Sequence, residues 1–452
     1  MSTFSSINQA SRALSAAQRG METTGQNIAN ANTPGYSRQR VEQSAGVLAQ
    51  TGQQVQRNTP GDGVQVTGIA RVADALATAT ARQDSATAAE QKTASQVWAG
   101  IETALADTGT SGLSKDLADL SSAWNDLANA GDDGLAAARS LVLSRTGSVV
   151  STIRGMDDQL QSQYTGLTDQ ARSVASDVNR AAASVAKLNE AIRNTLAAGG
   201  SANELLDQRE QHLSTLANAT GARTVQRDGG VVDVYVGNAA LVSGDKSSTL
   251  TIGVPAGASI GGELTTTVGG MAATPAAGTL KGLLDGANTT LVEQKEALDD
   301  FATTFAKGVN DAVKQVAGNG DLLSTTDSGG GTGNAARDLA LTATATSFAD
   351  SAAGTVDRAA AKAAVTGLRT VTTAWRKEVT DIATSAQSAE NRAALAEQVS
   401  LKSDAAREAV SGVNLDEEMT NLVAYQHAYS AAARVLSVID EALSTLINTV
   451  GR

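Results

Sequence analysis

Histidine and cysteine carry much of the acid–base, nucleophilic and metal chemistry of proteins, and this sequence has very little of either. Its 452 residues contain two histidines, His212 and His427, and no cysteine. The histidines are too far apart to form an HExxH pair. The absence of thiols excludes disulfides, thiolate nucleophiles and zinc–thiolate sites. We therefore expect no metal site and no cofactor.

Two other patterns could suggest chemistry. Asp416, Glu417 and Glu418 are consecutive carboxylates, but neighbours in a helix do not share a face, and acidic residues at a helix start complement the helix dipole. The string GTGNAA at 331–336 fits GxGxxA, but no strand precedes it, as a dinucleotide site would require. No catalytic set remains, and we expect that the protein is not an enzyme.

Composition narrows the partners. The net charge is −12 and aromatic residues make up 3% of the chain. Nucleic-acid binding needs clustered Lys and Arg, so we exclude it. No apolar run reaches the ~18 residues of a membrane-spanning helix. The opening MSTFSSINQASRAL lacks the basic and apolar regions of a secretory signal peptide.

Helices dominate the predicted elements. Only four prolines occur, and the tracts 61–254 and 276–452 contain none, so both are free of the strongest helix breaker. Apolar residues repeat in 4-3 steps over 160–192 and again over 284–305, which is the pattern of left-handed coiled-coil packing. The first repeat occupies Leu160, Tyr164, Leu167, Ala171, Val174, Val178, Ala181, Val185, Leu188 and Ile192.

One region has strand character. Asp228-Gly229 separates two β-branched runs, which predicts a hairpin. Beyond it, alternation places three valines (232, 234 and 236) on one face and Asp233 and Tyr235 on the other. The predicted fold is mainly α: a long coiled-coil or helical-bundle rod formed by both chain termini and the flanking helices, with a small inserted β domain.

The predicted division of the chain follows from these patterns. The two ends form the halves of a terminal coiled-coil domain, the first half together with the turn after it. Three helical rod segments, the β domain and a Gly/Ala-rich loop or extension lie between them. In chain order the parts are 1–60 (coil and turn), 61–221 (rod), 222–275 (β domain), 276–317 (rod), 318–355 (loop or extension), 356–410 (rod) and 411–452 (coil).

The two ends carry matching apolar stripes. The N-terminal stripe recurs every seven residues, and the C-terminal stripe follows 4-3 steps. Burying so few large side chains does not offset the entropy of ordering a terminal helix, so we expect the ends to order only against neighbouring copies. The candidate assembly residues on the stripes are Ile7, Leu14, Met21, Ile28, Leu415, Met419, Leu422, Tyr429, Leu436, Leu443 and Ile447.

A turn signal follows the first stripe. In NIANANTPGYSRQRV (27–41) the asparagines and Pro34-Gly35 predict that the helix stops there. Pro34, Gly35 and Tyr36 complete the candidate assembly residues. We also expect Tyr36, Arg38 and Arg40 to contact a neighbouring subunit beyond the turn.

These terminal motifs resemble a known family. NIANANTPGYSRQRV and SGVNLDEEMTNLVAYQHAYSAAARVLSVIDEALSTL (411–446) are similar to the two ends of the flagellar hook-associated protein 1 family, the hook–filament junction proteins of the axial rod and hook superfamily. Interior stretches also resemble that family's helical-body motifs: GDGVQVTGIARVAD (61–74), ELLDQREQHLSTLA (204–217) and GTLKGLLDGANTTLVEQKEALDDFATTFAKGVNDAV (278–313).

The resemblance implies a structural flagellar subunit, secreted and located outside the cell between hook and filament. Its implied partners are other copies of itself in a ring of the axial tube, hook protein, hook-associated protein 3, an export chaperone and the flagellar type III export apparatus. It implies no membrane insertion and no nucleic-acid partner. Two alternatives stay open: another axial protein (hook, rod or hook-associated protein 3), or a coiled-coil signalling scaffold outside the flagellum. A peptidoglycan-cleaving flagellar enzyme is disfavoured because no acid–base site is present.

Overall fold

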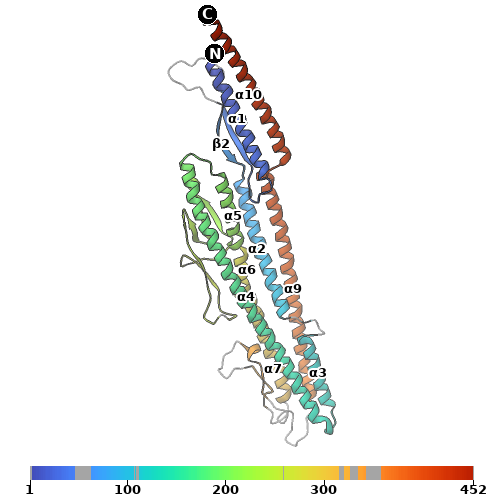
Figure 1. The fold of residues 1–452 in the computed structure, drawn as a ribbon. Helices are drawn as coiled ribbons and strands as arrows, with labels where there is room; N and C mark the ends of the chain where they lie inside the picture. Colours follow the sequence, from blue (N-terminus) through green and yellow to red (C-terminus); the bar gives the residue numbers. More distant parts are fainter. Residues whose placement is uncertain are drawn as a thin grey trace.

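The computed structural model describes residues 3–45, 63–105, 107, 111–257, 259–314, 320–325, 334–342 and 358–450. They form an elongated helical rod with both marked chain ends at one tip (Figure 1), which confirms the predicted mainly α fold class. The helices are α1 Thr3–Ala29, α2 Ala75–Ala104, α3 Leu113–Asn129, α4 Leu135–Ala197, α5 Asn203–Thr220, α6 Gly278–Asp285, α7 Leu291–Lys314, α8 Ala335–Asp338, α9 Arg358–Ser411 and α10 Leu415–Val450.

The strands form four small antiparallel sheets. β1 pairs with β2, β10 with β11, and the others form sheets in the orders β3-β4-β5-β6 and β7-β8-β9. Their bounds are β1 Gln39–Ala45, β2 Val64–Arg71, β3 Arg223–Gln226, β4 Val232–Val236, β5 Ala239–Ser243, β6 Lys246–Ser247, β7 Leu250–Gly253, β8 Thr265–Val268, β9 Met271–Ala272, β10 Leu323–Ser324 and β11 Ala340–Leu341.

Helix α4 is the central helix of the rod. Of the ten seam positions predicted on it, eight are buried and two, Val174 and Leu188, are partly buried. Helix α4 does not follow one partner helix: it packs in turn against α3, α5, α6, α7 and the strands of the inserted region. The heptad pattern therefore predicts correctly which face is buried, although several elements cover that face.

The second predicted rod is interrupted by a π-helical turn at Gly286–Thr290, between α6 and α7. A Cβ at Gly286 would lie 2.7 Å from Cγ2 of Val97 on α2, so the close approach of the two helices needs glycine there. Of the predicted apolar positions, Leu291 and Phe305 are fully buried. Phe301 stacks at a tilt against Trp375 of α9, with ring centroids 5.1 Å apart.

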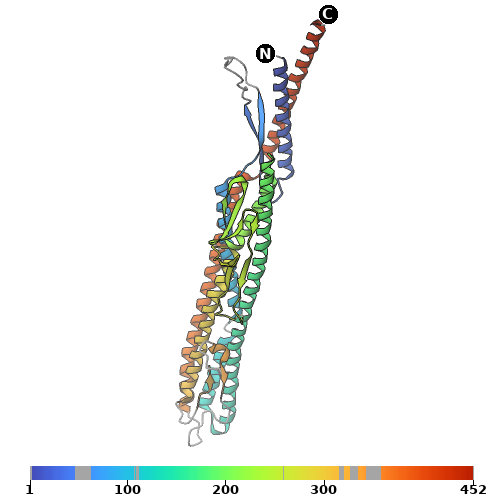
Figure 2. The ribbon, with the colours of Figure 1, turned by 90° about the vertical axis from the view of Figure 1, so that its left-hand side faces the viewer.

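The inserted β region lies along one side of α4 (Figures 1 and 2). The expected hairpin joins β3 to β4, and Val232, Val234 and Val236 are buried as the alternation predicts. Asp233, which we placed on the opposite face, is also buried. Its carboxylate accepts hydrogen bonds from Arg227 Nε (2.7 Å) and the Gly244 N–H (2.9 Å), which lowers its pKa against the effect of burial.

Helix asparagines attach the extended segments to the rod. In each case the side-chain Oδ1 accepts the N–H of one residue and Nδ2 donates to the carbonyl of that residue, as a neighbouring strand would. For Asn179 and Leu250 the two distances are 2.7 and 2.9 Å. The same double bond joins Asn189 to Val232, Asn288 to Leu264, Asn310 to Leu323 and Asn27 to Gln39.

Two predicted assignments need comment. We placed 61–74 in the helical rod, but Val64–Arg71 is strand β2, paired with β1 beside the terminal helices. That prediction was wrong because VQVTGIAR alternates at period two, and a strand satisfies this pattern. The predicted loop or extension at 318–355 lies largely outside the described residues. Within it, β10, α8 and β11 are present.

Candidate assembly interface and the joint that supports it

Helices α1 and α10 pack side by side at one end of the rod, and the β1–β2 hairpin lies beside them (Figure 2). Helix α1 approaches α10 through small residues. A Cβ at Gly20 would lie 2.5 Å from the ring of Tyr425, so this glycine admits the tyrosine. The buried positions of α1 are Ala10, Ala16, Ala17, Gly20, Thr23, Thr24 and Asn27.

The face that α10 turns inward agrees with the predicted 4-3 series at some positions and differs from it at others. The structure buries Glu418 and Ala432 and partly buries Leu422, Tyr425, Tyr429, Ile439 and Leu443. Of these, Leu422, Tyr429 and Leu443 are predicted members of the stripe. Met419, by contrast, is 51% exposed, because its neighbour Glu418 takes the inward position.

Most predicted assembly residues keep apolar surface uncovered within the chain. Ile7, Leu14, Met21 and Ile28 lie at the edge of the α1–α10 contact and are half-buried, as are Leu422, Tyr429 and Leu443. Leu415, Met419, Leu436 and Ile447 are exposed. The large side chains of both stripes are therefore available for contacts outside the chain.

The turn after α1 is where the sequence predicts it. The helix ends at Ala29, and Gly35 has φ 78°, a conformation that favours glycine. Gln211 of α5 donates its Nε2 to the Pro34 carbonyl (2.6 Å). A Cβ at Gly35 would lie 2.5 Å from that same Nε2. The Pro34 carbonyl therefore docks the turn on α5, and Gly35 allows its backbone conformation.

Asn27 is the centre of a buried polar cluster, the joint cluster, that ties both terminal helices to the body. Its Nδ2 donates to the Gln39 carbonyl and to Glu418 Oε2, each at 2.9 Å. Its Oδ1 accepts from the Tyr36 hydroxyl (2.9 Å) and from the Gln39 N–H (3.0 Å). The joint cluster consists of Asn27, Tyr36, Ser37, Arg38, Gln39, Asp207 and Glu418.

Arg38 completes the link to α10. Its Nε lies 2.8 Å from Glu418 Oε1 and its Nη1 lies 2.9 Å from Glu417 Oε2. Its N–H also donates to the Ser411 carbonyl at the end of α9 (2.9 Å). We predicted that Tyr36, Arg38 and Arg40 reach a neighbouring subunit. Within the chain, Tyr36 and Arg38 make the contacts given above and Arg40 is exposed on β1; contact with a neighbouring subunit stays a prediction.

Asp207 of α5 anchors the other side of the joint cluster. Its Oδ2 accepts the Ser37 N–H (3.1 Å), and its Oδ1 lies 2.6 Å from Arg71 Nε on β2. Burial, together with the charges of Asp207, Glu204 and Glu418, raises the pKa of Tyr36 to about 12. The Tyr36 hydroxyl therefore stays protonated and donates a hydrogen bond to Asn27 Oδ1.

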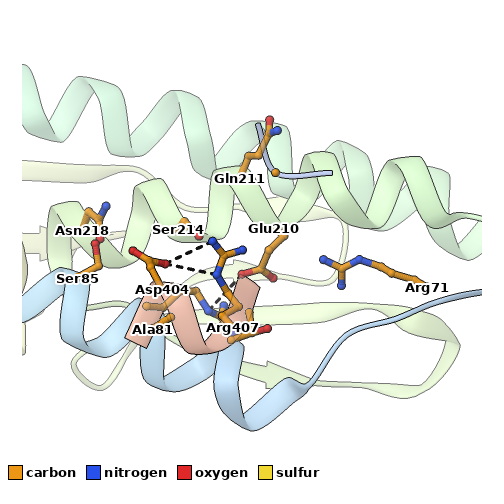
Figure 3. A pocket seen from close by; sticks show the side chains of 12 residues that line it. Arg71, Ala81, Ser85, Glu210, Gln211, Ser214, Asn218, Asp404 and Arg407 are labelled. Atoms are coloured by element: carbon orange, nitrogen blue, oxygen red, sulfur yellow. Dashed lines mark hydrogen bonds and ion pairs between the residues drawn. The ribbon is translucent and has the colours of Figure 1, made fainter. Parts of the chain in front are cut away.

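A cavity of about 300 Å³ lies between α2, α5 and α9, next to the joint cluster. Glu210 and Arg407 line it (Figure 3). Arg82 lines it as well, with its Nε 3.4 Å from Glu210 Oε1. Burial raises the pKa of Glu210, against the opposing effect of the surrounding arginines. The Arg82–Glu210 pair joins α2 to α5, and Arg407 pairs with Asp404 within α9. Among the described residues, no group of three His, Cys, Asp or Glu side chains could hold a metal ion.

The histidines are on separate helices, as expected: His212 lies on α5 and His427 on α10. In the part of the chain that the structure describes, no helix has the length and apolar character needed to cross a membrane. Two terminal helices whose apolar stripes are only partly covered are thus held to the rod body by buried polar contacts.

Comparison with known proteins matches three parts of this architecture to flagellar families. Residues 98–322 match the flagellar hook-associated protein FlgK helical domain. Residues 7–36 match the flagella basal body rod protein family, and residues 408–449 match the flagellar basal body rod FlgEFG protein C-terminal family. The two terminal matches coincide with α1 and its turn and with α10.

Curated relatives agree. The chain is 27% identical to flagellar hook-associated protein 1 of Bacillus subtilis, over 100% of this chain and 99% of that protein. It is 27% identical to the Escherichia coli protein of the same name, over 67% of this chain and 56% of the relative. The hook junction protein of Burkholderia pseudomallei superposes with a TM-score of 0.46 at 24% identity, covering 56% of this chain and 46% of that one, and that score is too low to carry an argument.

A rod whose two termini share one coiled coil, each matching a rod-protein family, defines the class of flagellar axial proteins. Within that class, the chain is similar to the flagellar hook-associated protein 1 family, both in its matched helical body and along the full-length relative.

Proposed function

We propose that this chain is a structural subunit that forms the junction between the flagellar hook and filament. The observation that carries the proposal is the burial of α10: of its described side chains, only Glu418 and Ala432 are buried within the chain. Most of the stability of a helix in a protein comes from the packing of its apolar face, and α10 has little of that packing within the chain. Neighbouring copies in an axial tube would supply the missing contacts.

The joint cluster supports this role. It holds the first turn of α10 through Glu418 and the last turn of α1 through Asn27, so the base of the coiled coil has a fixed direction. Beyond this base, the two helices rely on the half-buried and exposed stripes. In this proposal the distal turns are loose in the monomer and become ordered when sister molecules surround them.

The partners follow from the place of the family in the flagellum. The subunit would form a ring with copies of itself, pack against hook protein on one side and hook-associated protein 3 on the other, and be held by an export chaperone before passing through the flagellar type III apparatus. Residues 1–452 contain no cysteine, so no disulfide has to be broken or formed during passage of the unfolded chain.

Deletion of the gene in the source bacterium tests the proposal. We expect hooks without filaments in electron micrographs and unpolymerised flagellin in the medium. Full filaments would contradict the junction role. Cells without hooks would instead indicate an earlier axial position, such as rod or hook.

A complementation series locates the function on the coiled coil. Met419→Glu should fail to restore motility although its monomer melts at the wild-type temperature, because Met419 is exposed in the monomer. Ser173→Glu, at an exposed position of α4, is the matched control and should restore motility. Pro34→Ala combined with Gly35→Ala should extend α1 past the turn and block assembly. Normal motility of that double variant would refute the role of the turn.

A further inference from the structure

Strand β3 forms one edge of its sheet, since the strand order is β3-β4-β5-β6. Gln226 lies opposite Val232 in the antiparallel register, but the N–H and the carbonyl of Val232 both bond to Asn189 of α4 (3.2 and 2.7 Å). This pair is therefore a non-hydrogen-bonded one, and Thr224, two residues along, belongs to the next such pair. Thr224 and Gln226 consequently direct their main-chain N–H and C=O groups away from β4, to the free edge.

The free edge of β3 has none of the usual protection. In the part of the chain that the structure describes, no strand pairs with this edge. Sheet edges are commonly protected by Lys, Pro or a β-bulge. Strand β3 has the sequence RTVQ, without Lys or Pro, and its register with β4 has no irregularity. The edge is therefore able to pair with one further strand of a few residues.

Two cavities, of about 390 and 430 Å³, lie beside the free edge and share Ala79, Arg82 and Thr224 in their linings. We call them together the β3 groove, which is lined mainly by α2, α5 and β3. The α2 residues on one face of the helix that line it are Ala75, Ala79, Arg82, Ala86 and Glu90. Three of these five are alanines, which leave room for a second main chain. The row spans about 22 Å of helix, the length of an extended peptide of about seven residues.

The charges of the β3 groove are mostly positive, in a chain whose net charge is −12. Two charged residues of the lining have partners outside the groove. Arg71 is paired with Asp207 (2.6 Å). Glu90 is paired with Lys281 (3.3 Å). The remaining charged residues of the lining are Arg82, Arg209, Arg223 and Glu210. Three guanidinium groups thus share one carboxylate, which favours an anionic occupant.

Other contacts do not neutralise these three guanidinium groups. Arg209 donates to an asparagine oxygen and to a main-chain carbonyl, and Arg223 lies over the ring of Tyr235, so the partners of both are uncharged. Arg82 Nε lies 3.4 Å from Glu210 Oε1, and neither atom makes a hydrogen bond within the described chain. A carboxylate that enters the groove would give the Arg82 guanidinium an acceptor.

From the free edge and the charge, we infer that the β3 groove binds an extended acidic peptide of another protein, which adds a fifth strand to the sheet. The main chain of the peptide pairs with the outward groups of Thr224 and Gln226. Successive side chains of a strand point to opposite faces, so carboxylates at every second position share the face toward Arg82. The site lies on the rod body and does not depend on the proposed junction role.

Binding of designed peptides tests the inference. The probes are three blocked, fluorophore-labelled peptides of seven residues, with Glu at every second position and Val, Thr or Ala between. Fluorescence anisotropy with the full chain should give at least one Kd below about 1 mM. Replacing Glu by Gln should weaken that binding about tenfold, and added salt should weaken it as well. Failure of all three peptides to bind, or equal binding of the Glu and Gln peptides, would overturn the inference.

Amide exchange tests the pairing of the peptide with β3. The outward N–H groups of Thr224 and Gln226 should exchange about tenfold more slowly when the peptide is bound. The N–H of Val225 points toward β4 and should be unaffected, which makes it the internal control. Binding without protection at Thr224 and Gln226 would show that the peptide does not add a strand, and the inference would be wrong.

A matched pair of variants locates the peptide. Ala79→Trp fills the β3 groove from α2 and should weaken binding by about tenfold or more, with an unchanged melting temperature because Ala79 is exposed. Thr80→Trp, at the next exposed position and outside the lining, should leave the Kd unchanged. Wild-type affinity in Ala79→Trp would place the peptide elsewhere and overturn the inference. If the chain alone formed a dimer in sedimentation experiments and Ala79→Trp abolished it, a second copy would be the occupant and the peptide proposal would be overturned.

Discussion

Replacing Asn27 by Asp probes the joint cluster with a change of almost no volume. The variant keeps the oxygen that accepts from Tyr36 and from the Gln39 N–H, but it loses the Nδ2 that donates to the Gln39 carbonyl and to Glu418. A buried carbonyl without a donor costs roughly 1–3 kcal/mol, and a lost bond to a charged group costs roughly 1.5–3 kcal/mol. The new carboxylate would also face the Glu418 carboxylate across a 2.9 Å contact.

We therefore expect Asn27→Asp to weaken the docking of α1 and α10 by about 3–5 kcal/mol at neutral pH. The loss should be smaller at mildly acidic pH, where one of the two carboxyl groups takes up a proton. The midpoint of global unfolding should change less than the docking of the two helices. All three tryptophans (Trp98, Trp124 and Trp375) lie in the body. Tryptophan fluorescence therefore reports the body, whereas trypsin cleavage at the exposed Arg19 and Arg434 reports the coiled coil.

Asn179→Asp is the matched control, because Asn179 makes the same double bond to Leu250 far from the joint. It should destabilise the inserted strands without faster cleavage of α1 or α10. The double variant Asn27→Asp with Glu418→Gln should recover part of the loss, giving a coupling energy of about 1 kcal/mol or more in a double-mutant cycle. Cleavage at the wild-type rate in Asn27→Asp, or a coupling energy of zero, would refute the assignment of the joint.

Two further predictions concern the same end of the molecule. Gly20→Leu should force α1 away from Tyr425 and destabilise the α1–α10 pair by about 1–3 kcal/mol, measured as faster amide exchange in α10. The control Gly25→Ala, with nothing within 4 Å of the new Cβ, should leave the exchange unchanged or slow it. Equal effects of both changes would exclude close packing at Gly20. The pKa of Tyr36 is raised from its ordinary 10 to about 12 in the folded protein. Its contribution to stability is therefore complete below pH 10 and is lost as the pH rises through 12. If Tyr36→Phe removed no phenolate absorbance at high pH, the buried hydroxyl would be contradicted.

The apolar repeats show which buried faces can be predicted from the sequence. The seam of α4 was predictable because its partners, although different, all cover one face, so the periodicity survives in the side chains. On α10 the series includes Leu422, Tyr429 and Leu443 of the inward face, but it could not include Glu418, a charged residue in an inward position. A buried carboxylate is tolerated there only because Arg38 and Asn27 meet it, and Asn27 is 391 residues away in the chain. Sequence patterns hold no information on such a distant pairing.

The asparagines that attach the strands have one feature that is visible in the sequence. Asn179, Asn189, Asn288 and Asn310 lie inside helical segments and not at the N-caps where asparagine is favoured. An asparagine in a helix interior competes for main-chain hydrogen bonds, so each is locally unfavourable. Such residues could have been interpreted as points where another segment of chain is bound, although the sequence could not identify the segment.

The asparagine attachments affect which substitutions the attached strands can accept. Each asparagine binds only the N–H and carbonyl of its target, and every residue except proline presents both groups. The hydrogen bonds to the asparagines therefore do not depend on the side chain of the residue that is bound. The buried side chains of the strands are still fixed by packing, but their exposed side chains can change without loss of the attachment.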